Sequence, residues 1–252
     1  MKQHLSVLML IVRSSIYKVI AALIAMAAVQ AGLFEYALQK NLQSGGHYLE
    51  NIVSKSGIAW VFAAAFLLLT YVISRTGCKN DSQPGYTIQR LGISERSFFI
   101  WQAVYNTAVY ALLLGAELLL LMALARYWQT VANQDLIGAQ SIFLAFYRND
   151  FMHCICPLDD IWLWIRNGIL AISMGMAAAQ YPFRQRRGKT LQVVVIMAAA
   201  TLAFFVRGLG GEVRDFFAIS MALIVIGKVV YNLWGGDENE EARSFPLCAA
   251  GD

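Results

Sequence analysis

The chain has 252 residues, of which 58% are hydrophobic and 14% are charged, and its formal net charge is +4. Soluble domains carry roughly 25% charged residues, so this composition excludes an ordinary soluble domain and indicates a membrane protein. The sequence contains no basic patch interleaved with aromatic residues, and we therefore expect no nucleic-acid partner.

Apolar runs recur along the chain, and crossing about 30 Å of hydrocarbon takes about 20 helical residues. The runs predict an all-α, polytopic membrane protein with six transmembrane helices, at roughly 17–37, 57–74, 98–125, 161–181, 191–207 and 216–234. The connections leave no room for a separate soluble domain. We expect one membrane domain over residues 1–234 and a disordered, polar cytoplasmic tail over residues 235–252.

The N-terminal segment MKQHLSVLMLIVRSSIYKVI begins like a signal peptide, but Arg13 and Lys18 interrupt the apolar core that such a peptide needs. Apolar side chains recur there at helical spacing instead, at Leu5, Leu8, Met9, Val12 and Ile16. The pattern predicts an interfacial N-terminal helix anchored to lipid head groups by basic side chains. The first span would then begin near Tyr17.

The distribution of basic residues predicts the orientation, because Lys and Arg in short loops favour the cytoplasmic side. With the N-terminus inside, the cytoplasmic side holds thirteen, namely Lys2, Arg13, Lys18, Arg75, Lys79, Arg90, Arg96, Arg184, Arg186, Arg187, Lys189, Lys228 and Arg243. The outer side holds six, namely Lys40, Lys55, Arg126, Arg148, Arg207 and Arg214. We therefore expect both termini in the cytoplasm and the chain in the cytoplasmic membrane.

The connection RTGCKNDSQPGYTIQRLGISERS, residues 75–97, is the longest cytoplasmic one on this topology. Pro84-Gly85 ends its irregular part, and residues Tyr86 to Leu91 predict a short helix that Gly92 stops. Ser94 can cap the helix that follows. We expect a short helix on the membrane surface, then a turn and a long third span.

The stretch TIQRLGISERSFFIWQ resembles the segment before the third span in permease subunits of ABC-2 type ATP-binding-cassette exporters. In that family a leucine, a small or proline residue and S-x-R precede the span, and the short helix is a coupling helix that docks on the ATPase subunit. The resemblance implies that the ATPase is contacted by Tyr86, Gln89, Arg90, Leu91 and Glu95.

The wider likeness is one of layout, covering the N-terminal helix, the six spans and the basic inner loops. The family usually has a re-entrant hairpin before its last span, for which VRGLGGEVRD is too short, and the outer connection from Tyr127 to Asp160 is unusually long. The resemblance implies a homo- or heterodimer of permease subunits with a separate ABC ATPase that binds ATP and Mg. Gly188-Lys189-Thr190 matches only the end of a phosphate-binding loop, so we interpret FRQRRGKT as a basic inner loop.

Ionisable side chains inside predicted spans are costly and therefore mark structural or functional contacts. Glu117 lies in the third span and Arg166 in the fourth, and both fall towards the outer side. We expect them to form an interhelical salt bridge, and a role in cargo recognition stays open. Interhelical hydrogen bonds are expected from Gln30, Asn106 and Gln180.

The outer segment FYRNDFMHCICPLDDIW brings potential metal ligands close together in sequence, namely His153, Cys154, Cys156, Asp159 and Asp160. Three interpretations stay open: a metal site, a disulfide or redox pair, and an amphipathic helix at the outer interface. A C-x-C pair is too closely spaced for the usual zinc site. The aromatic side chains of Phe143, Phe146, Tyr147 and Phe151 favour the interfacial helix, and we expect no metal.

The spans contain no H-E-x-x-H motif, no paired acidic motif and no Ser/His arrangement facing across them, so we expect no catalytic residues and no cofactor in this chain. We expect a permease subunit that moves an unidentified cargo with ATP hydrolysed by its partner. A non-transporting sensor or assembly factor and an ion-coupled secondary transporter stay open as alternatives.

Overall fold

The described part of the chain is helical throughout, which confirms the all-α prediction. The structure, a computed structural model, describes residues 2–43, 48–75, 95–132, 140–158, 160–186, 193–206 and 212–234. Its helices are α1 (Lys2–Gln43), α2 (Leu49–Ser56), α3 (Ile58–Arg75), α5 (Glu95–Val131), α6 (Ser141–Arg148), α7 (Asp150–Ile155), α8 (Ile161–Arg186), α9 (Val193–Val206) and α10 (Glu212–Trp234).

Within the described residues, five helices are long and apolar enough to cross a membrane, and they make this a multi-pass membrane protein. The apolar stretches are Leu8–Gln43, Ile58–Arg75, Arg96–Val131, Ile161–Pro182 and Val213–Trp234. The fifth predicted span corresponds to α9, whose 14 residues rise only about 21 Å. The described residues therefore provide five of the six predicted spans as long apolar helices and the other as a shorter apolar helix.

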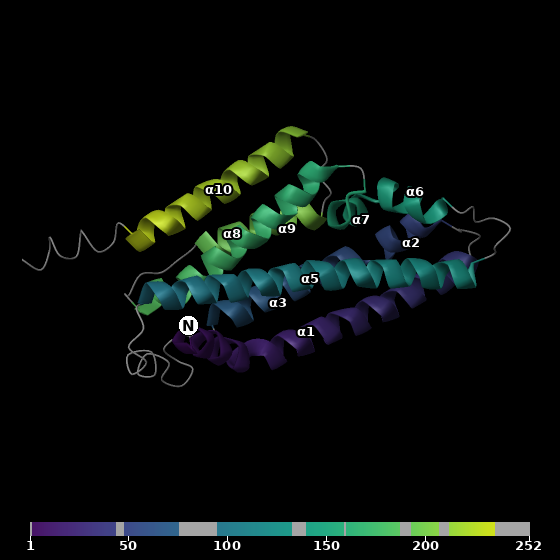
Figure 1. Ribbon diagram of the computed structural model, residues 1–252. Helices are drawn as coiled ribbons and strands as arrows, with labels where there is room; N and C mark the ends of the chain where they lie inside the picture. Colours follow the sequence, from purple (N-terminus) through teal and green to yellow (C-terminus); the bar gives the residue numbers. More distant parts are fainter. Residues whose placement is uncertain are drawn as a thin grey trace, which may run out of the picture.

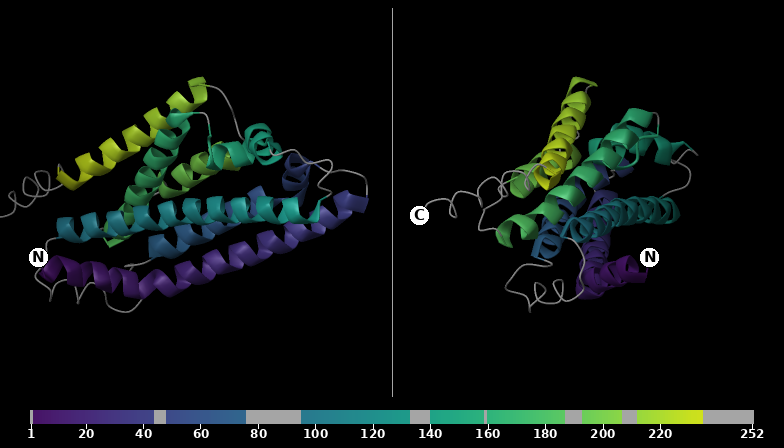
Figure 2. Two further views of the ribbon diagram at one scale, coloured as in Figure 1. Left: turned by 45° about the vertical axis from the view of Figure 1, so that its right-hand side comes forward. Right: turned by 60° about the vertical axis from the view of Figure 1, so that its left-hand side comes forward.

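The N-terminal helix α1 is continuous over 42 residues, so the predicted interfacial helix and the first span are parts of one helix without a break near Tyr17. Residues 2–31 contain no Gly or Pro that would end a helix. The helix bends near its N-terminal end instead (Figure 2). Ser14 and Ser15 both donate to the carbonyl of Ile11, at 2.8 and 3.3 Å, and such bonds within a helix often bend it.

Helix α5 lies at the centre of the bundle, with α1 along one side and α8 along the other (Figure 1). It also contacts α3 and α7, while α10 packs on α8. At one end of the bundle, which we call the N-terminal end, α1, α5 and α9 begin and α3, α8 and α10 end (Figures 1 and 2). Successive apolar helices thus run in opposite directions.

The opposite end, which we call the far end, is built from the extended ends of α1 and α5 together with three short helices, α2, α6 and α7 (Figure 1). At 42 and 37 residues, α1 and α5 are about 63 and 56 Å long, roughly twice the thickness of the hydrocarbon layer. Both therefore project well beyond a bilayer that covers the other helices.

Local signals explain why the short helices end where they do. Helix α2 stops at Gly57, which takes the left-handed conformation (φ 76°) that favours glycine. Asn149 caps α7 by accepting from the amide of Met152 at 3.1 Å, and its side-chain amide donates to the Glu50 carbonyl at 3.1 Å and to Ser54 Oγ at 3.0 Å. Asn149 thereby ties α7 to α2 as well as starting the helix.

Candidate functional site

Four buried polar side chains of α5 form the candidate site, because together they reach three neighbouring helices, α1, α3 and α8. Tyr105, Asn106, Tyr110 and Glu117 are all buried, although the helix is apolar along most of its length. A polar group buried without a partner costs free energy, so such groups occur where they make a specific contact. We call these four residues and their partners the α5 polar contacts.

Two of the α5 polar contacts join hydroxyl groups. The Tyr105 hydroxyl lies 2.7 Å from Ser15 Oγ on α1, and the Tyr110 hydroxyl donates to Thr70 Oγ1 on α3 at 2.9 Å. Tyr110 also packs its ring against Phe66, with ring centroids 5.3 Å apart. These contacts fix the position of α1 and α3 along α5.

Glu117 pairs with Gln30 of α1, so the predicted salt bridge between Glu117 and Arg166 is wrong. Gln30 Nε2 donates to Glu117 Oε2 at 2.9 Å, and both side chains are fully buried. The expected interhelical hydrogen bond of Gln30 is therefore confirmed. The remaining oxygens, Gln30 Oε1 and Glu117 Oε1, have no hydrogen-bond partner.

Arg166 pairs instead with Asp215 in the first turn of α10, with Nη1 and Oδ1 2.5 Å apart. Arg166 also donates from Nε and Nη2 to Asn167 Oδ1, at 3.3 and 3.1 Å, and Asn167 donates to the carbonyl of Cys154 at 2.8 Å. These bonds join α7, α8 and α10. Asp215 was missed from the sequence, although an acid in the first turn of an apolar helix is a detectable signal.

The contact between α5 and α8 is close at Gly175. A Cβ atom placed on Gly175 would clash with Thr107 Oγ1 and would lie 2.7 Å from the backbone nitrogen of Thr107 and 2.9 Å from its Cα. Asn106 Nδ2 donates to the carbonyl of Gly175 at 3.4 Å, which confirms the expected interhelical bond of Asn106. The predicted polar residue Gln180 is buried on the same helix.

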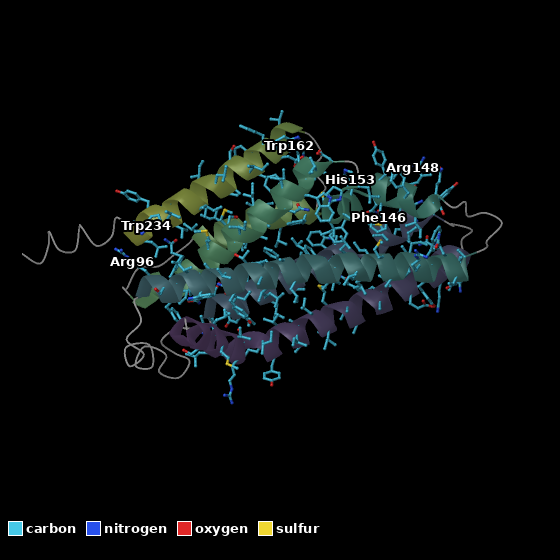
Figure 3. The ribbon with its side chains drawn as sticks, viewed as in Figure 1. Arg96, Phe146, Arg148, His153, Trp162 and Trp234 are labelled. Atoms are coloured by element: carbon cyan, nitrogen blue, oxygen red, sulfur yellow. The ribbon has the colours of Figure 1, made fainter. Side chains whose placement is uncertain are left out.

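An apolar cleft with a volume of about 420 Å³ opens between α5, α8 and α10. Its walls include Phe99, Ala103 and Met176, and also Arg96 and Trp234, which lie at the N-terminal end of the bundle (Figure 3). In the described residues, the only extensive contact of α10 with another helix is the one with α8. Helix α10 is therefore held mainly from one side.

Cys154 and Cys156 lie in and directly after α7, and both thiols are free and buried. Burial raises the pKa of the Cys154 thiol, partly opposed by the Arg166 guanidinium, and burial also raises the pKa of the Cys156 thiol. Neutral, buried thiols are poor nucleophiles, which argues against a reactive redox pair. In the described residues, which exclude Asp159, no group of three His, Cys, Asp or Glu side chains is placed to hold a metal ion.

The predicted interfacial segment forms two helices rather than one. Helix α6 buries Phe146 and exposes Phe143, Leu144 and Tyr147, which suits a helix lying at an interface. Helix α7 buries Phe151, whose ring packs edge-on against Phe62 of α3 at 5.7 Å. Figure 3 shows Phe146, Arg148 and His153 together near the far end.

The residues expected to contact an ATPase fall almost entirely outside the described part of the chain. Tyr86, Gln89, Arg90 and Leu91 lie there, and so do Gly188-Lys189-Thr190 and the predicted tail, residues 235–252. Glu95 is the first residue of α5. The end of α3 and the start of α5, which flank the undescribed residues 76–94 in sequence, both lie at the N-terminal end of the bundle (Figure 1).

The comparisons with known proteins identify no relative: no protein-family model, no curated protein and no solved structure matches this chain.

Proposed function

We propose that the chain is the membrane-spanning permease subunit of an ATP-binding-cassette exporter of the ABC-2 type, located in the cytoplasmic membrane. The observation that carries the proposal is the continuity between the ABC-2-like stretch TIQRLGISERSFFIWQ and α5, the helix that the polar contacts tie to α1, α3 and α8. A force applied to this stretch would act directly on the central helix of the bundle.

The proposed topology has six crossings with both termini in the cytoplasm. Helix α9 is short, but it runs opposite to α8 and α10 (Figure 1), which supports counting it as a crossing. Arg75 and Arg96 lie at the N-terminal end of the bundle, which is the end that the excess of basic residues assigns to the cytoplasm. The far end, with α2, α6 and α7, then faces outward.

The proposed mechanism divides the work between two kinds of subunit. A separate ATPase binds ATP and Mg and hydrolyses the nucleotide, and residues 86–95 dock on it as a coupling helix. When two ATPase subunits close on ATP, they displace the coupling helices, and α5 carries that motion to α1, α3 and α8 through the α5 polar contacts. Two permease subunits, identical or different, enclose a path for an unidentified cargo.

Replacement of Leu91 by aspartate is expected to abolish stable binding of the ATPase. Leu91 is the leucine of the ABC-2-like stretch and the last residue of the predicted docking helix, and we expect its side chain to anchor the interface. Truncating a central anchor of an interface typically costs about 2 kcal/mol or more. That loss corresponds to binding roughly 30-fold weaker. The measurement is the amount of ATPase that co-purifies with Leu91→Asp, normalised to the amount of permease recovered from the membrane.

Glu95→Ala is the matched control, because it removes a charge at the edge of the same segment and should cost much less. Both variants should insert normally, since the changes lie outside the hydrocarbon layer. Wild-type recovery of the ATPase with Leu91→Asp would contradict the coupling-helix assignment. It would favour a non-transporting sensor or assembly factor.

A further inference from the structure

The pair formed by Gln30 and Glu117 lacks one hydrogen-bond donor. One bond is present, from Gln30 Nε2 to Glu117 Oε2 at 2.9 Å. The other two oxygens, Gln30 Oε1 and Glu117 Oε1, are buried and have no partner. Leaving a buried acceptor unsatisfied is costly, and such groups are rare in folded proteins.

One proton supplies the missing donor. An ionised carboxylate can only accept hydrogen bonds, whereas a protonated carboxyl also has one O–H donor. A proton on Glu117 Oε1 can be donated to Gln30 Oε1, while Gln30 Nε2 continues to donate to Glu117 Oε2. Because the carboxyl and the amide are planar groups already joined at one edge, the second bond closes a ring and satisfies both oxygens.

We propose that Glu117 and Gln30 form a proton-binding site between α1 and α5, in which the protonated carboxyl and the amide exchange two hydrogen bonds. The inference rests on the burial and bonding of this pair, so it does not depend on the proposed transport function. Its ligand is a single proton, bound by forming the Glu117 O–H bond and released to water when that bond breaks.

In the part of the chain that the structure describes, no basic side chain forms an ion pair with Glu117 that would neutralise its carboxylate in place of a proton. Charged or ionisable groups on the helices packed against α5 include Lys2, His4, Arg13, Lys18, Glu35 and Lys40 on α1, Tyr71 and Arg75 on α3, Asp150, His153 and Cys154 on α7, and Arg166, Arg184 and Arg186 on α8. Of these, Glu35 accepts from Gln39, Arg75 donates to Tyr71, and Arg166 binds Asp215. Glu117 itself bonds only to Gln30 in the described residues, so an ionised Glu117 would be a buried charge without a counter-charge.

Proton binding is therefore linked to the contact between α1 and α5. Loss of the proton removes the O–H donor and places a carboxylate beside the amide oxygen of Gln30, which weakens the contact. By linkage, a movement that separates α1 from α5 and admits water favours release of the proton. The site can couple proton uptake to the approach of these two helices.

The test compares the infrared spectrum of the purified wild-type protein at neutral pH with that of Glu117→Gln. A protonated carboxyl gives a C=O absorption distinct from that of a carboxylate, and we expect this band in the wild type and its loss in Glu117→Gln. Absence of the protonated-carboxyl band from the wild type, or its persistence at full intensity in Glu117→Gln, would overturn the proposal.

Stability supplies an independent readout, because a glutamine at position 117 reproduces both hydrogen bonds of the protonated pair. The melting temperature of Glu117→Gln should stay within about 3 °C of the wild-type value. Failure of Glu117→Gln to fold would overturn the proposal, since an ionised carboxylate would then be required.

Glu35→Gln is the matched control, because Glu35 is a carboxylate on α1 that takes part in an exposed hydrogen bond with Gln39. It should leave the protonated-carboxyl band unchanged. Gln30→Leu should instead shift the band to higher frequency, because the carbonyl oxygen of the Glu117 carboxyl loses its donor. A band unaffected by Gln30→Leu would show that the proton lies elsewhere.

Discussion

Gly175→Ala is expected to lower the melting temperature of the purified protein by several degrees, or to prevent folding. The new Cβ would lie within 3 Å of the backbone nitrogen and Cα of Thr107, as well as its Oγ1. A side-chain rotation can move the hydroxyl but not the backbone, so α5 and α8 must separate along their whole contact. Overpacking of this kind costs typically about 1–3 kcal/mol, and more when backbone atoms clash.

Gly168→Ala is the matched control for this prediction. Gly168 lies on the same helix, and a Cβ placed on it has no atom within 4 Å. Because alanine favours a helix interior by about 1 kcal/mol over glycine, this variant should be as stable as the wild type or slightly more stable. Thermal unfolding of both variants in the same detergent measures the difference. Equal melting temperatures for Gly175→Ala and the wild type would contradict the close approach of α5 and α8.

Asp215→Asn, at the junction of α7, α8 and α10, is expected to lower the stability of the protein strongly. Arg166 is 2% exposed and would lose its counter-charge while remaining buried. Removing one partner of a buried ion pair typically costs about 3–5 kcal/mol, because the remaining charge stays desolvated. We expect a large fall in melting temperature or in the yield of folded protein.

Two further variants test whether the loss of stability in Asp215→Asn comes from leaving Arg166 as a buried, unpaired charge. Arg148→Gln removes one partner of a longer and more exposed ion pair, 3.8 Å from Glu50, and should change stability by less than about 1 kcal/mol. The double variant Arg166→Leu with Asp215→Leu should recover much of the stability lost in Asp215→Asn, since neither charge is then buried. If Asp215→Asn is no worse than Arg148→Gln, the ion pair does not hold α10 to α8.

Composition and apolar run length predicted the membrane class and the places of the long helices, because both depend on properties that are local in sequence. They did not predict where α1 and α5 end. Both helices continue past the predicted apolar runs through residues such as Lys40 and Arg126, which are good helix formers outside the hydrocarbon layer. The end of an apolar run therefore marks where the chain leaves the hydrocarbon layer, and it does not mark where the helix ends.

Helix α2 was not predicted, although its sequence carries a usable signal. Its buried residues Leu49, Ile52, Val53 and Ser56 follow the spacing of one helical face, and Gly57 ends the helix. An eight-residue helix gives only one such pattern, which is why a search for long apolar runs passes over it.

The partner of Glu117 could not be predicted from its depth in the membrane. Their positions along the predicted spans placed Glu117 and Arg166 at a similar depth, towards the same side of the membrane. The choice of partner, however, depends on which helix faces each side chain. In the structure α1 brings Gln30 to Glu117, and α10 brings Asp215 to Arg166. The spacing of apolar residues predicts which face of a helix is buried, but it does not predict which neighbouring helix packs against that face.

The measurement that tests the central claim most directly is purification of the wild-type chain from its native membrane, followed by an assay for ATP hydrolysis in the purified material. The proposed function predicts that a separate ATP-hydrolysing subunit co-purifies with the chain in a fixed ratio, and that the activity is lost when that subunit is removed. Recovery of the folded chain alone, from mild detergent and without ATP hydrolysis above background, would contradict the assignment to an ATP-driven exporter.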